Sequence, residues 1–259
     1  MSSLNPSFAT IRVRHDDDIY FLQIHRPDAG NAINAQLVDE MTQALIEFES
    51  QAKVVVLEGL PEVFCSGADF KELQTRFDSG EAPEQDPGPL YDLWYRLASG
   101  PYITVAHVRG RVNAGGVGFV AACDVVLSDD KASFSLSELL FGLMPACVLP
   151  FLIRRIGAVK ANYMTLMTMP ITAQLAERWG LVDGCEADSD NLLRKQLLRL
   201  RRLGKAGIRR YKRYAGELGD DLKVAKSRAL QANREVFTDP DNLRSIARYV
   251  KTGKFPWEG

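Results

Sequence analysis

Residues 112–124 read VNAGGVGFVAACD and place three glycines, Gly115, Gly116 and Gly118, within four positions. Glycine is unfavourable inside a helix, yet the segment follows a strand-like run and continues as a small apolar helix. Free N–H groups at a helix start can stabilise negative charge on a carbonyl oxygen, and glycine leaves the backbone open to a substrate. We therefore interpret Gly115 and Gly116 as a backbone approach site, with Asn113 as the N-cap. Close packing of a helix on a strand needs the same small residues, so the glycines by themselves leave both interpretations open.

Glu138, in the segment SLSELLFG, follows a strand-like run and precedes apolar residues. A carboxyl buried in apolar surroundings has a raised pKa, which suits it to exchange a proton near neutral pH. Such an acid could remove the proton next to a carbonyl group and then protonate a departing hydroxyl group. The alternative is a solvated surface charge.

Further polar and aromatic residues have two interpretations each. Asp69, in CSGAD, is a second candidate acid, although we favour a cap for the helix that begins near residue 70. Asn113 is a candidate to contact a leaving hydroxyl group or a distal carboxylate of the substrate. His107 lies in an apolar run, which favours a core histidine over a base. Tyr91 and Trp94 share a helix face and either line the acyl pocket or pack in the core.

The elements that must position these residues alternate along the first part of the chain. Residues 19–25 and 52–59 read as strands. Between them, residues 34–50 carry apolar side chains at spacings of three and four, which predicts an amphipathic helix. The order strand, helix, strand indicates crossover connections and parallel pairing, and therefore the α/β class. The segment 78–90 is rich in Gly, Pro and acidic residues and predicts a loop, and the chain beyond about residue 158 reads as mostly helical.

The last third of the chain contains a strongly basic segment. Ten Arg and Lys residues lie between Arg194 and Arg213. Leucines interleave with them, which predicts one amphipathic helix with a basic face. Its roles could be docking of an acidic partner, binding of coenzyme A phosphates, a solvated face, or RNA binding, which no aromatic array supports. The residues we assign to docking are Arg194, Lys195, Arg199, Arg201, Arg202, Arg209 and Arg210.

Composition excludes several classes of protein. The net charge of −1 over 259 residues excludes a globally basic nucleic-acid binder. No apolar run reaches the roughly 18 residues of a membrane span, and the N-terminus lacks the apolar core of a signal peptide, so we expect a cytoplasmic protein. Four dispersed cysteines and three histidines predict buried thiols and no metal site. The cysteines are Cys65, Cys123, Cys147 and Cys185.

Four motifs occur in the order found in one family, the crotonase superfamily of enoyl-CoA hydratases and isomerases, which this chain resembles. The resemblance implies the ClpP/crotonase-like α/β fold of repeated ββα units, with a core at residues 1–190 that holds an acyl-thioester site. A C-terminal helical region at 191–259 would cover that site, and trimers or dimers of trimers would form. The motifs are HRPDAGNAIN (25–34), FCSGADF (64–70), the block VRGRVNAGG…FGLMP (108–145) and AERWGLVD (176–183).

The resemblance also implies roles for individual residues. The backbone N–H groups of Ala68 and Gly115 would form an oxyanion hole, with Gly116, Gly118, Tyr91 and Trp94 at the substrate pocket. Hydratases of the family carry two glutamates, at the positions of Gly118 and Glu138. This chain therefore keeps only the second acid, which places ordinary water addition by a glutamate pair in doubt.

Within the superfamily, the chain is similar to the dehydratase of polyketide β-branching (HMG-synthase) cassettes. That resemblance implies dehydration of 3-hydroxy-3-methylglutaryl-acyl carrier protein to 3-methylglutaconyl-acyl carrier protein, with no cofactor beyond the thioester arm. Three alternatives stay open: a decarboxylase of the same cassette, a general enoyl-CoA hydratase or isomerase, and a non-catalytic binding module. Segments that suggest the dehydratase are LEGLPEVFCSGADF, SFSLSELLFGLMPACVLPFLIRRIG and the ending GKFPWE.

Overall fold

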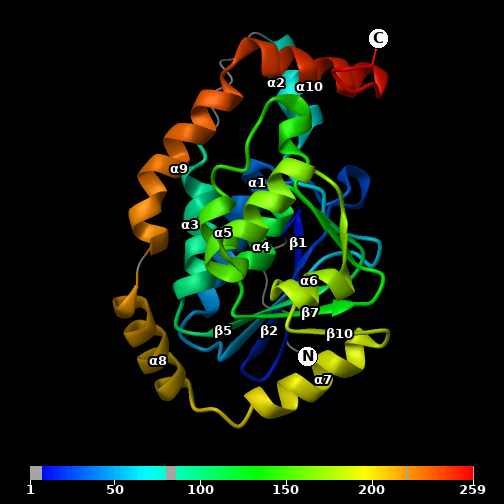
Figure 1. Cartoon of the computed structure of the whole chain (residues 1–259). Coiled ribbons are helices and arrows are strands. Elements are labelled where there is room, and N and C mark those ends of the chain that lie inside the picture. Colours follow the sequence, from blue (N-terminus) through cyan, green and yellow to red (C-terminus); the bar gives the residue numbers. More distant parts are fainter. Residues whose placement is uncertain (1–7, 80–85, 220, 259) are drawn as a thin grey trace.

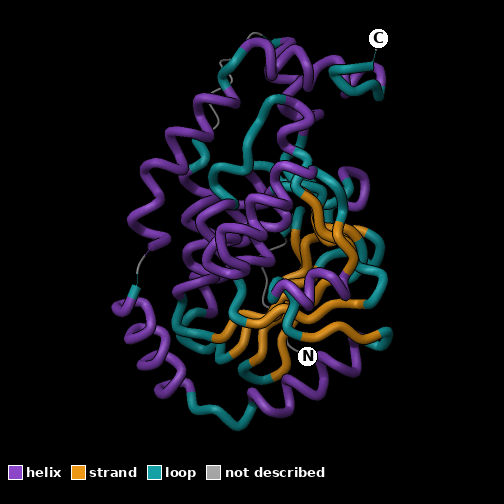
Figure 2. Tube along the Cα trace, in the orientation of Figure 1, coloured by secondary structure: helices purple, strands orange, loops and turns teal. Residues whose placement is uncertain are grey.

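The computed structural model of the chain describes residues 8–79, 86–219 and 221–258. The centre of the predicted loop 78–90 therefore lies outside the described residues. Figure 2 shows the strands gathered in one part of the molecule, with helices beside them and around the outside. The α/β class predicted from the sequence is confirmed.

The larger sheet has six strands in the order β1-β2-β3-β5-β7-β10. β1 and β2 form an antiparallel hairpin, and the other neighbours are parallel. All five side chains of β3 are buried, which is why its sequence VVVLE is nearly all apolar. The strands are β1 (Ile11–Asp16), β2 (Ile19–Ile24), β3 (Val54–Glu58), β5 (Ile103–Val108), β7 (Val125–Asp129) and β10 (Gly184–Glu186).

The smaller sheet consists of β4 (Val63–Cys65), β6 (Arg111–Asn113), β8 (Ser133–Ser135) and β9 (Ile171–Thr172), paired in that order. β4, β6 and β8 are mutually parallel, and β9 is antiparallel to β8. The successive pairs β3–β4, β5–β6 and β7–β8 each give one strand to each sheet before a helix follows. This is the predicted repetition of ββα units.

The core helices fill the space beside the two sheets (Figure 1). The predicted helix at 34–50 is confirmed as α1 (Ala35–Phe48), and the Asn34 side chain caps its first turn by accepting from Leu37 N. α4 contacts both α3 and α5 as well as β4 and β6, so it lies at the centre of the core. The other elements are η1 (Pro27–Ala29), α2 (Phe70–Asp78), α3 (Gly88–Ser99), α4 (Gly115–Ala122), η2 (Glu138–Phe141), α5 (Leu149–Met167) and α6 (Ala173–Trp179).

The C-terminal helices run around the outside of the core (Figure 1). They are α7 (Ser189–Leu200), α8 (Lys205–Leu218), α9 (Asp221–Phe237) and α10 (Pro240–Thr252). α7 packs against β7 and β10, and α9 packs against α3 and α5. α10 packs against α2 and against η2, the element that begins with Glu138. The predicted division after residue 190 falls inside α7.

The prediction of a single basic helix is wrong. The first helix, α7, ends at Leu200, and a second helix begins beyond Gly204, which has extended backbone angles. The positive charges are therefore divided between α7 and α8. Several are already engaged within the chain, such as Arg201 with Asp16, and Lys205 with the carbonyl oxygens of Glu49 and Ala52.

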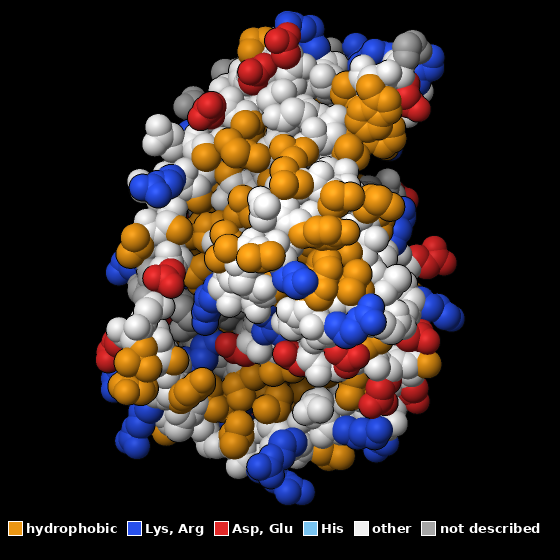
Figure 3. All heavy atoms as spheres, viewed as in Figure 1, with side chains coloured by type: hydrophobic (Ala, Val, Ile, Leu, Met, Phe, Trp, Pro, Cys, Tyr) orange, Lys and Arg blue, Asp and Glu red, His pale blue; other side chains and the backbone are white. Residues whose placement is uncertain are grey.

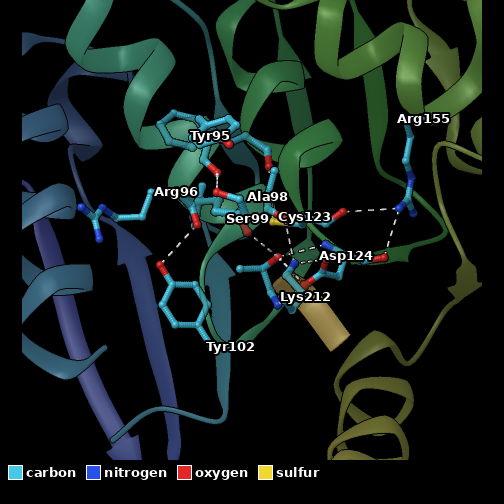
Figure 4. A network of polar contacts seen from close by, with 12 residues as sticks. Tyr95, Arg96, Ala98, Ser99, Tyr102, Cys123, Asp124, Arg155 and Lys212 are labelled. Atoms are coloured by element: carbon cyan, nitrogen blue, oxygen red, sulfur yellow. Dashed lines mark hydrogen bonds and ion pairs between the residues drawn. The ribbon is translucent and has the colours of Figure 1, made fainter. Parts of the chain in front are cut away.

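Lys212 anchors α8 to the core through a buried polar network (Figure 4). Its ammonium group pairs with Asp124 and donates to the carbonyl oxygen of Ala98, at 2.8 Å. The other carboxylate oxygen of Asp124 accepts from the backbone N–H of Thr104 at 2.9 Å. Arg155 donates to the carbonyl oxygens of Cys123 and Asp124 from the opposite side. Because every group in this network has a partner, the buried charge fixes where α8 sits.

Among the described residues, no helix is both long enough and apolar enough to cross a membrane. The thiols of Cys65, Cys123 and Cys147 are buried as expected, whereas Cys185 is half-buried, and all four are free.

Candidate active site

The three predicted site segments lie at one edge of the smaller sheet. Cys65 of β4 pairs with Val112 of β6, and Asn113 of β6 pairs with Ser135 of β8. Because these strands are parallel, their carboxyl ends point to the same edge, where open α/β sheets commonly bind ligands. Ala68 follows β4, Gly115 follows β6 and Glu138 follows β8 within three residues each. The fold thus gathers residues that lie up to 70 positions apart in the sequence.

Both predicted oxyanion donors come directly after a residue with positive φ. Gly67 has φ +94°, and Ala114 has φ +50° with ψ −123°. A non-glycine residue in such a conformation is strained, and strain of this kind concentrates at functional sites. A Cβ on Gly67 would lie 2.7 Å from Ala114 Cβ and 3.6 Å from Gly115 N, so the two turns are in contact. In the described part of the chain, the N–H groups of Ala68 and Gly115 have no hydrogen-bond partner, which leaves both available to a ligand.

The prediction that Asn113 is the N-cap of α4 is wrong, because the strained Ala114 occupies that position. The Asn113 amide instead connects the loops. It donates to Ser137 Oγ at 2.9 Å and to the carbonyl oxygen of Ser66 at 3.4 Å, and it accepts from Ser135 Oγ at 2.8 Å. Asn113 therefore holds the loop before Glu138 against the two oxyanion turns.

Asp69 caps α2, which is the interpretation that we favoured. Its Oδ1 accepts from the backbone N–H of Glu72, at 3.2 Å. Its Oδ2 pairs with the guanidinium of Arg26 at 3.0 Å, and Arg26 also donates to the carbonyl oxygen of Ala32. Backbone bonds from Ile33 N to Gly67 O (2.7 Å) and from Asp69 N to Ile33 O (3.0 Å) complete the clamp. The clamp fixes the turn on which the Ala68 donor lies.

Glu138 begins η2 and is 8% exposed, so the alternative of a solvated surface charge is wrong. Burial raises the pKa of this carboxyl to about 7, and the N–H groups of Glu138 and Ser137 oppose that rise only partly. In the described part of the chain, its Oε2 has no hydrogen-bond partner. A buried polar atom without a partner is uncommon in a folded protein and calls for an explanation. The arrangement can therefore exchange a proton at neutral pH beside two oxyanion donors.

The glycines of α4 are required for different structural reasons. A Cβ on Gly116 would lie 2.7 Å from the carbonyl oxygen of Cys65, so this glycine permits close packing of α4 on β4. A Cβ on Gly118 would lie 2.6 Å from Cζ2 of Trp94. Of the two open interpretations, packing accounts for Gly116 and Gly118, which are buried, whereas Gly115 is partly exposed at the start of α4.

Tyr91 and Trp94 are both buried on α3. The Tyr91 hydroxyl donates to the carbonyl oxygen of Leu222 at 2.5 Å, so Tyr91 packs in the core instead of lining a pocket. The Trp94 indole packs edge-on against Phe119 and Phe151, with ring centroids 5.8 Å apart in both pairs.

His107 is a core histidine, as predicted. Its ring nitrogens lie 3.3 Å from Glu58 Oε1 and 3.0 Å from Ser189 Oγ, beneath the start of α7. The described residues contain no cluster of metal-ligating side chains.

Four residues near the site had no sequence signal of their own: Arg26, Ser135, Ser137 and Gln74. Arg26 lies in a recognised motif, but its partner Asp69 is 43 residues away. Gln74 of α2 is buried, and in the described part of the chain neither atom of its amide has a partner. Gln74 differs from an ordinary glutamine on a helix surface only in being buried, and burial cannot be read from the sequence.

Comparison with known proteins identifies the family of this chain. The model of the enoyl-CoA hydratase/isomerase family matches residues 14–259. The chain is 56% identical over 253 residues to the bacillaene synthase dehydratase PksH of Bacillus subtilis (strain 168), covering 97% of this chain and 98% of PksH. It is 34% identical over 168 residues to the mevalonyl-coenzyme A hydratase sidH of Aspergillus fumigatus, covering 64% and 62% of the two chains.

Solved structures of members of this family have the same fold as this chain. The crystal structure of pksH from Bacillus subtilis, a polyketide biosynthesis enoyl-CoA hydratase, has a TM-score of 0.95 at 55% identity and covers 96% of this chain and 100% of that one. An enoyl-CoA hydratase/isomerase from Acinetobacter baumannii has a TM-score of 0.83 at 23% identity, over 95% and 100% of the two chains, which shows the shared fold.

Proposed function

The chain belongs to the enoyl-CoA hydratase/isomerase family, the crotonase superfamily, and we propose that it dehydrates a 3-hydroxy-3-methylglutaryl group on an acyl carrier protein to 3-methylglutaconyl. The observation that carries the proposal is one buried carboxyl with a pKa of about 7, Glu138, at the strand ends that also hold two unpaired backbone donors among the described residues. A site for water addition by a pair of carboxylates would need a second acid at position 118, where this chain has glycine.

In the proposed reaction, the Glu138 carboxylate takes the proton from C2 of the thioester. The electron pair moves to the carbonyl oxygen, where the N–H groups of Ala68 and Gly115 stabilise the enolate. The enolate then forms the C2–C3 double bond as the C3–O bond breaks, and Glu138 returns its proton to the departing hydroxyl group. Water leaves and Glu138 is again a carboxylate. The reaction as written needs only the thioester arm, phosphopantetheine or coenzyme A, and no cofactor.

The names of two relatives support the substrate class. PksH is a dehydratase of bacillaene synthase, and sidH is a hydratase of mevalonyl-coenzyme A. Mevalonyl and 3-hydroxy-3-methylglutaryl groups share a tertiary 3-hydroxy-3-methyl centre. Loss of a tertiary hydroxyl group needs a proton donor more than it needs a positioned water, which matches a single carboxyl.

We assign Gln74 to the distal carboxylate of the substrate. The Phe70 ring packs edge-on against Phe141, with centroids 5.3 Å apart, and Phe141 lies three residues after Glu138. Gln74 is one helical turn beyond Phe70 on the same face of α2, a helix that packs mainly against α10. Its amide is buried with donor and acceptor unused in the described chain, so a carboxylate would satisfy the donor.

The carrier protein would dock on the basic surface of α7 and α8. Figure 3 shows Lys and Arg side chains over these two helices, with apolar side chains between them. Arg194 and Arg201 border a hollow of about 310 Å³ that Phe21 and Leu197 also line, together with the carboxylates of Asp16 and Asp190. Acyl carrier proteins are acidic, so charge would steer their approach. The proposed docking residues are Arg194, Lys195, Arg199, Arg201, Arg202, Arg209 and Arg210.

We also propose that the protein assembles as a homotrimer or hexamer in the cytoplasm. Figure 3 shows apolar side chains gathered over α5. Large exposed apolar patches commonly mark protein interfaces. Light scattering of the purified protein measures the assembly directly. The exposed apolar residues on and beside α5 are Ile153, Val159, Tyr163, Leu166, Met167 and Met169.

Intact-protein mass spectrometry of the carrier tests the function. The carrier is loaded with 3-hydroxy-3-methylglutaryl, incubated with the enzyme, and weighed. We expect a loss of one water. Loss of water together with carbon dioxide would indicate that the decarboxylase alternative applies as well. No change on the carrier, with turnover of a short enoyl-CoA, would assign the protein to the general hydratases or isomerases, and binding of the carrier without any turnover would indicate a binding module.

A separate experiment tests docking of the carrier protein on α8. Arg209→Glu with Arg210→Glu should raise KM for the carrier-bound substrate and leave turnover of the coenzyme A thioester unchanged. An equal effect on both substrates would contradict docking on α8.

A further inference from the structure

Trp94 and Gly118 meet inside the molecule at the position where hydratases of the family carry their second acid. A Cβ built on Gly118 would lie 2.6, 2.7 and 2.8 Å from Cζ2, Cη2 and Cε2 of the indole. Such distances fall well inside van der Waals contact. The same ring edge lies 3.8 and 4.0 Å from a Cβ built on Gly115, so the indole also borders the residue assigned as an oxyanion donor.

The indole cannot move aside without disturbing the core. Trp94 is 1% exposed and is packed edge-on between Phe119 of α4 and Phe151 of α5. Tyr91, one turn earlier on α3, is tied to α9 through its bond to Leu222. The ring is therefore held against Gly118 from several sides, and adding a methyl group to an interior packed this closely is destabilising.

We propose that Trp94 is a specificity-determining residue: its indole fills the volume that a side chain at position 118 requires, and so keeps the site to a single carboxyl, Glu138. The indole ring then stands where a water-activating acid would be, and it offers no carboxylate there; its buried N–H has no hydrogen-bond partner among the described residues. The site is thereby suited to release water from a 3-hydroxyacyl thioester and unsuited to add water to a simple enoyl thioester. This inference rests on the proposed function for its chemistry, but the packing that it requires can be measured without any substrate.

The packing test uses the sign of a stability change. Alanine is favoured over glycine inside a helix, so Gly118→Ala would ordinarily raise the melting temperature. Against the fixed indole we expect a fall of about 2–8 °C instead. In a Trp94→Leu background, the same substitution should raise the melting temperature relative to its own parent, because leucine lacks the ring atoms that the new Cβ would meet. Trp94→Phe is the substitute background if Trp94→Leu does not fold.

Gly116→Ala is the matched control, because its Cβ would meet the carbonyl oxygen of Cys65 at 2.7 Å and not Trp94. Its effect on the melting temperature should be the same in the parent protein and in the Trp94→Leu background. If Gly118→Ala stabilises the parent protein, or if both glycines respond alike to Trp94→Leu, the proposal is overturned.

The chemical test installs the missing acid and follows hydration of crotonyl-CoA. Gly118→Glu by itself should gain no hydration, whereas Gly118→Glu with Trp94→Ala should hydrate crotonyl-CoA at least about 100-fold faster than the parent. That gain should vanish when Glu138→Gln is added. Equal hydration by the single and double variants, or a folded double variant with no gain, would contradict the proposal. If the parent fails to dehydrate the loaded carrier while the melting temperatures follow the expected signs, the proposed function fails and the packing of Trp94 on Gly118 stands.

Discussion

Glu58 and Glu138 are two buried glutamates, 5% and 8% exposed; Glu58 ends β3 of the larger sheet, and Glu138 follows β8 of the smaller sheet by three residues. Burial acts to raise the pKa of both. At Glu58, a hydrogen bond from His107 and the charge of Arg14, 2.8 Å away, outweigh burial and lower the pKa. At Glu138, only two backbone N–H groups oppose burial, and the pKa rises to about 7. Two glutamates of similar small exposure thus differ in pKa, which is lowered at Glu58 at the end of β3 and raised at Glu138 at the start of η2.

Removing the Glu138 carboxyl should give the largest effect on activity. Glu138→Gln should lower kcat for carrier dehydration by about 10²–10⁴-fold, because the proposed reaction assigns both proton transfers to this carboxyl. The melting temperature at pH 8 should stay the same or rise, since the variant no longer buries a charge. Glu58→Gln measured in the same assay is the control and should keep its activity. Full turnover by Glu138→Gln would remove the distinction between the two glutamates.

The two carboxyls should also give opposite dependences of stability on pH. The folded pKa of Glu138 lies above its unfolded value of 4.5, so its contribution is fully present below pH 4.5 and is lost as pH rises through about 7. The loss amounts to about 3 kcal/mol in the free energy of unfolding. Urea unfolding between pH 5 and 8 should show that Glu138→Gln loses less stability than the parent over this window. An identical pH dependence would contradict the raised pKa.

Glu58→Gln should lower the free energy of unfolding by about 1–3 kcal/mol at pH 7, because His107 and Arg14 lose a charged partner. The folded pKa of Glu58 is lowered, so its contribution is present above pH 4.5 and is lost as pH falls through the lowered folded value. The difference between parent and variant should therefore shrink under acid. A variant as stable as the parent at pH 7 would show that the network around His107 has no stabilising role.

The smallest expected effect is the change of kcat/KM with pH in the parent protein. The proposed reaction starts from the Glu138 carboxylate, so kcat/KM should rise with pH through about 7 and level off above it. Between pH 6 and 8 the change should be roughly tenfold. The Glu138→Gln variant, measured for its residual rate, should show no such step. A profile that falls with rising pH would mean that the protonated acid starts the reaction.

Much of the site could be predicted from short segments of the sequence. The glycines after residue 112, the turn at CSGAD and the acid in SLSELLFG each stand within a few residues of a predicted strand, and parallel strands bring their ends to one edge. Strand and helix positions in the first part of the chain followed from periodicity, as α1 and β3 show. These features depend on residues that are close together in the sequence, and such local patterns can be read from the sequence directly.

The sequence by itself therefore determined the α/β class, the order of the strands along the chain and the three segments that meet at the site. Tertiary structure decided what each side chain touches. Asp69 pairs with Arg26 across 43 residues, Lys212 breaks the expected basic face by turning inward to Asp124 across 88, and Gly118 receives the Trp94 ring. The raised pKa of Glu138 belongs to the same group, because burial is a property of the space that distant segments enclose.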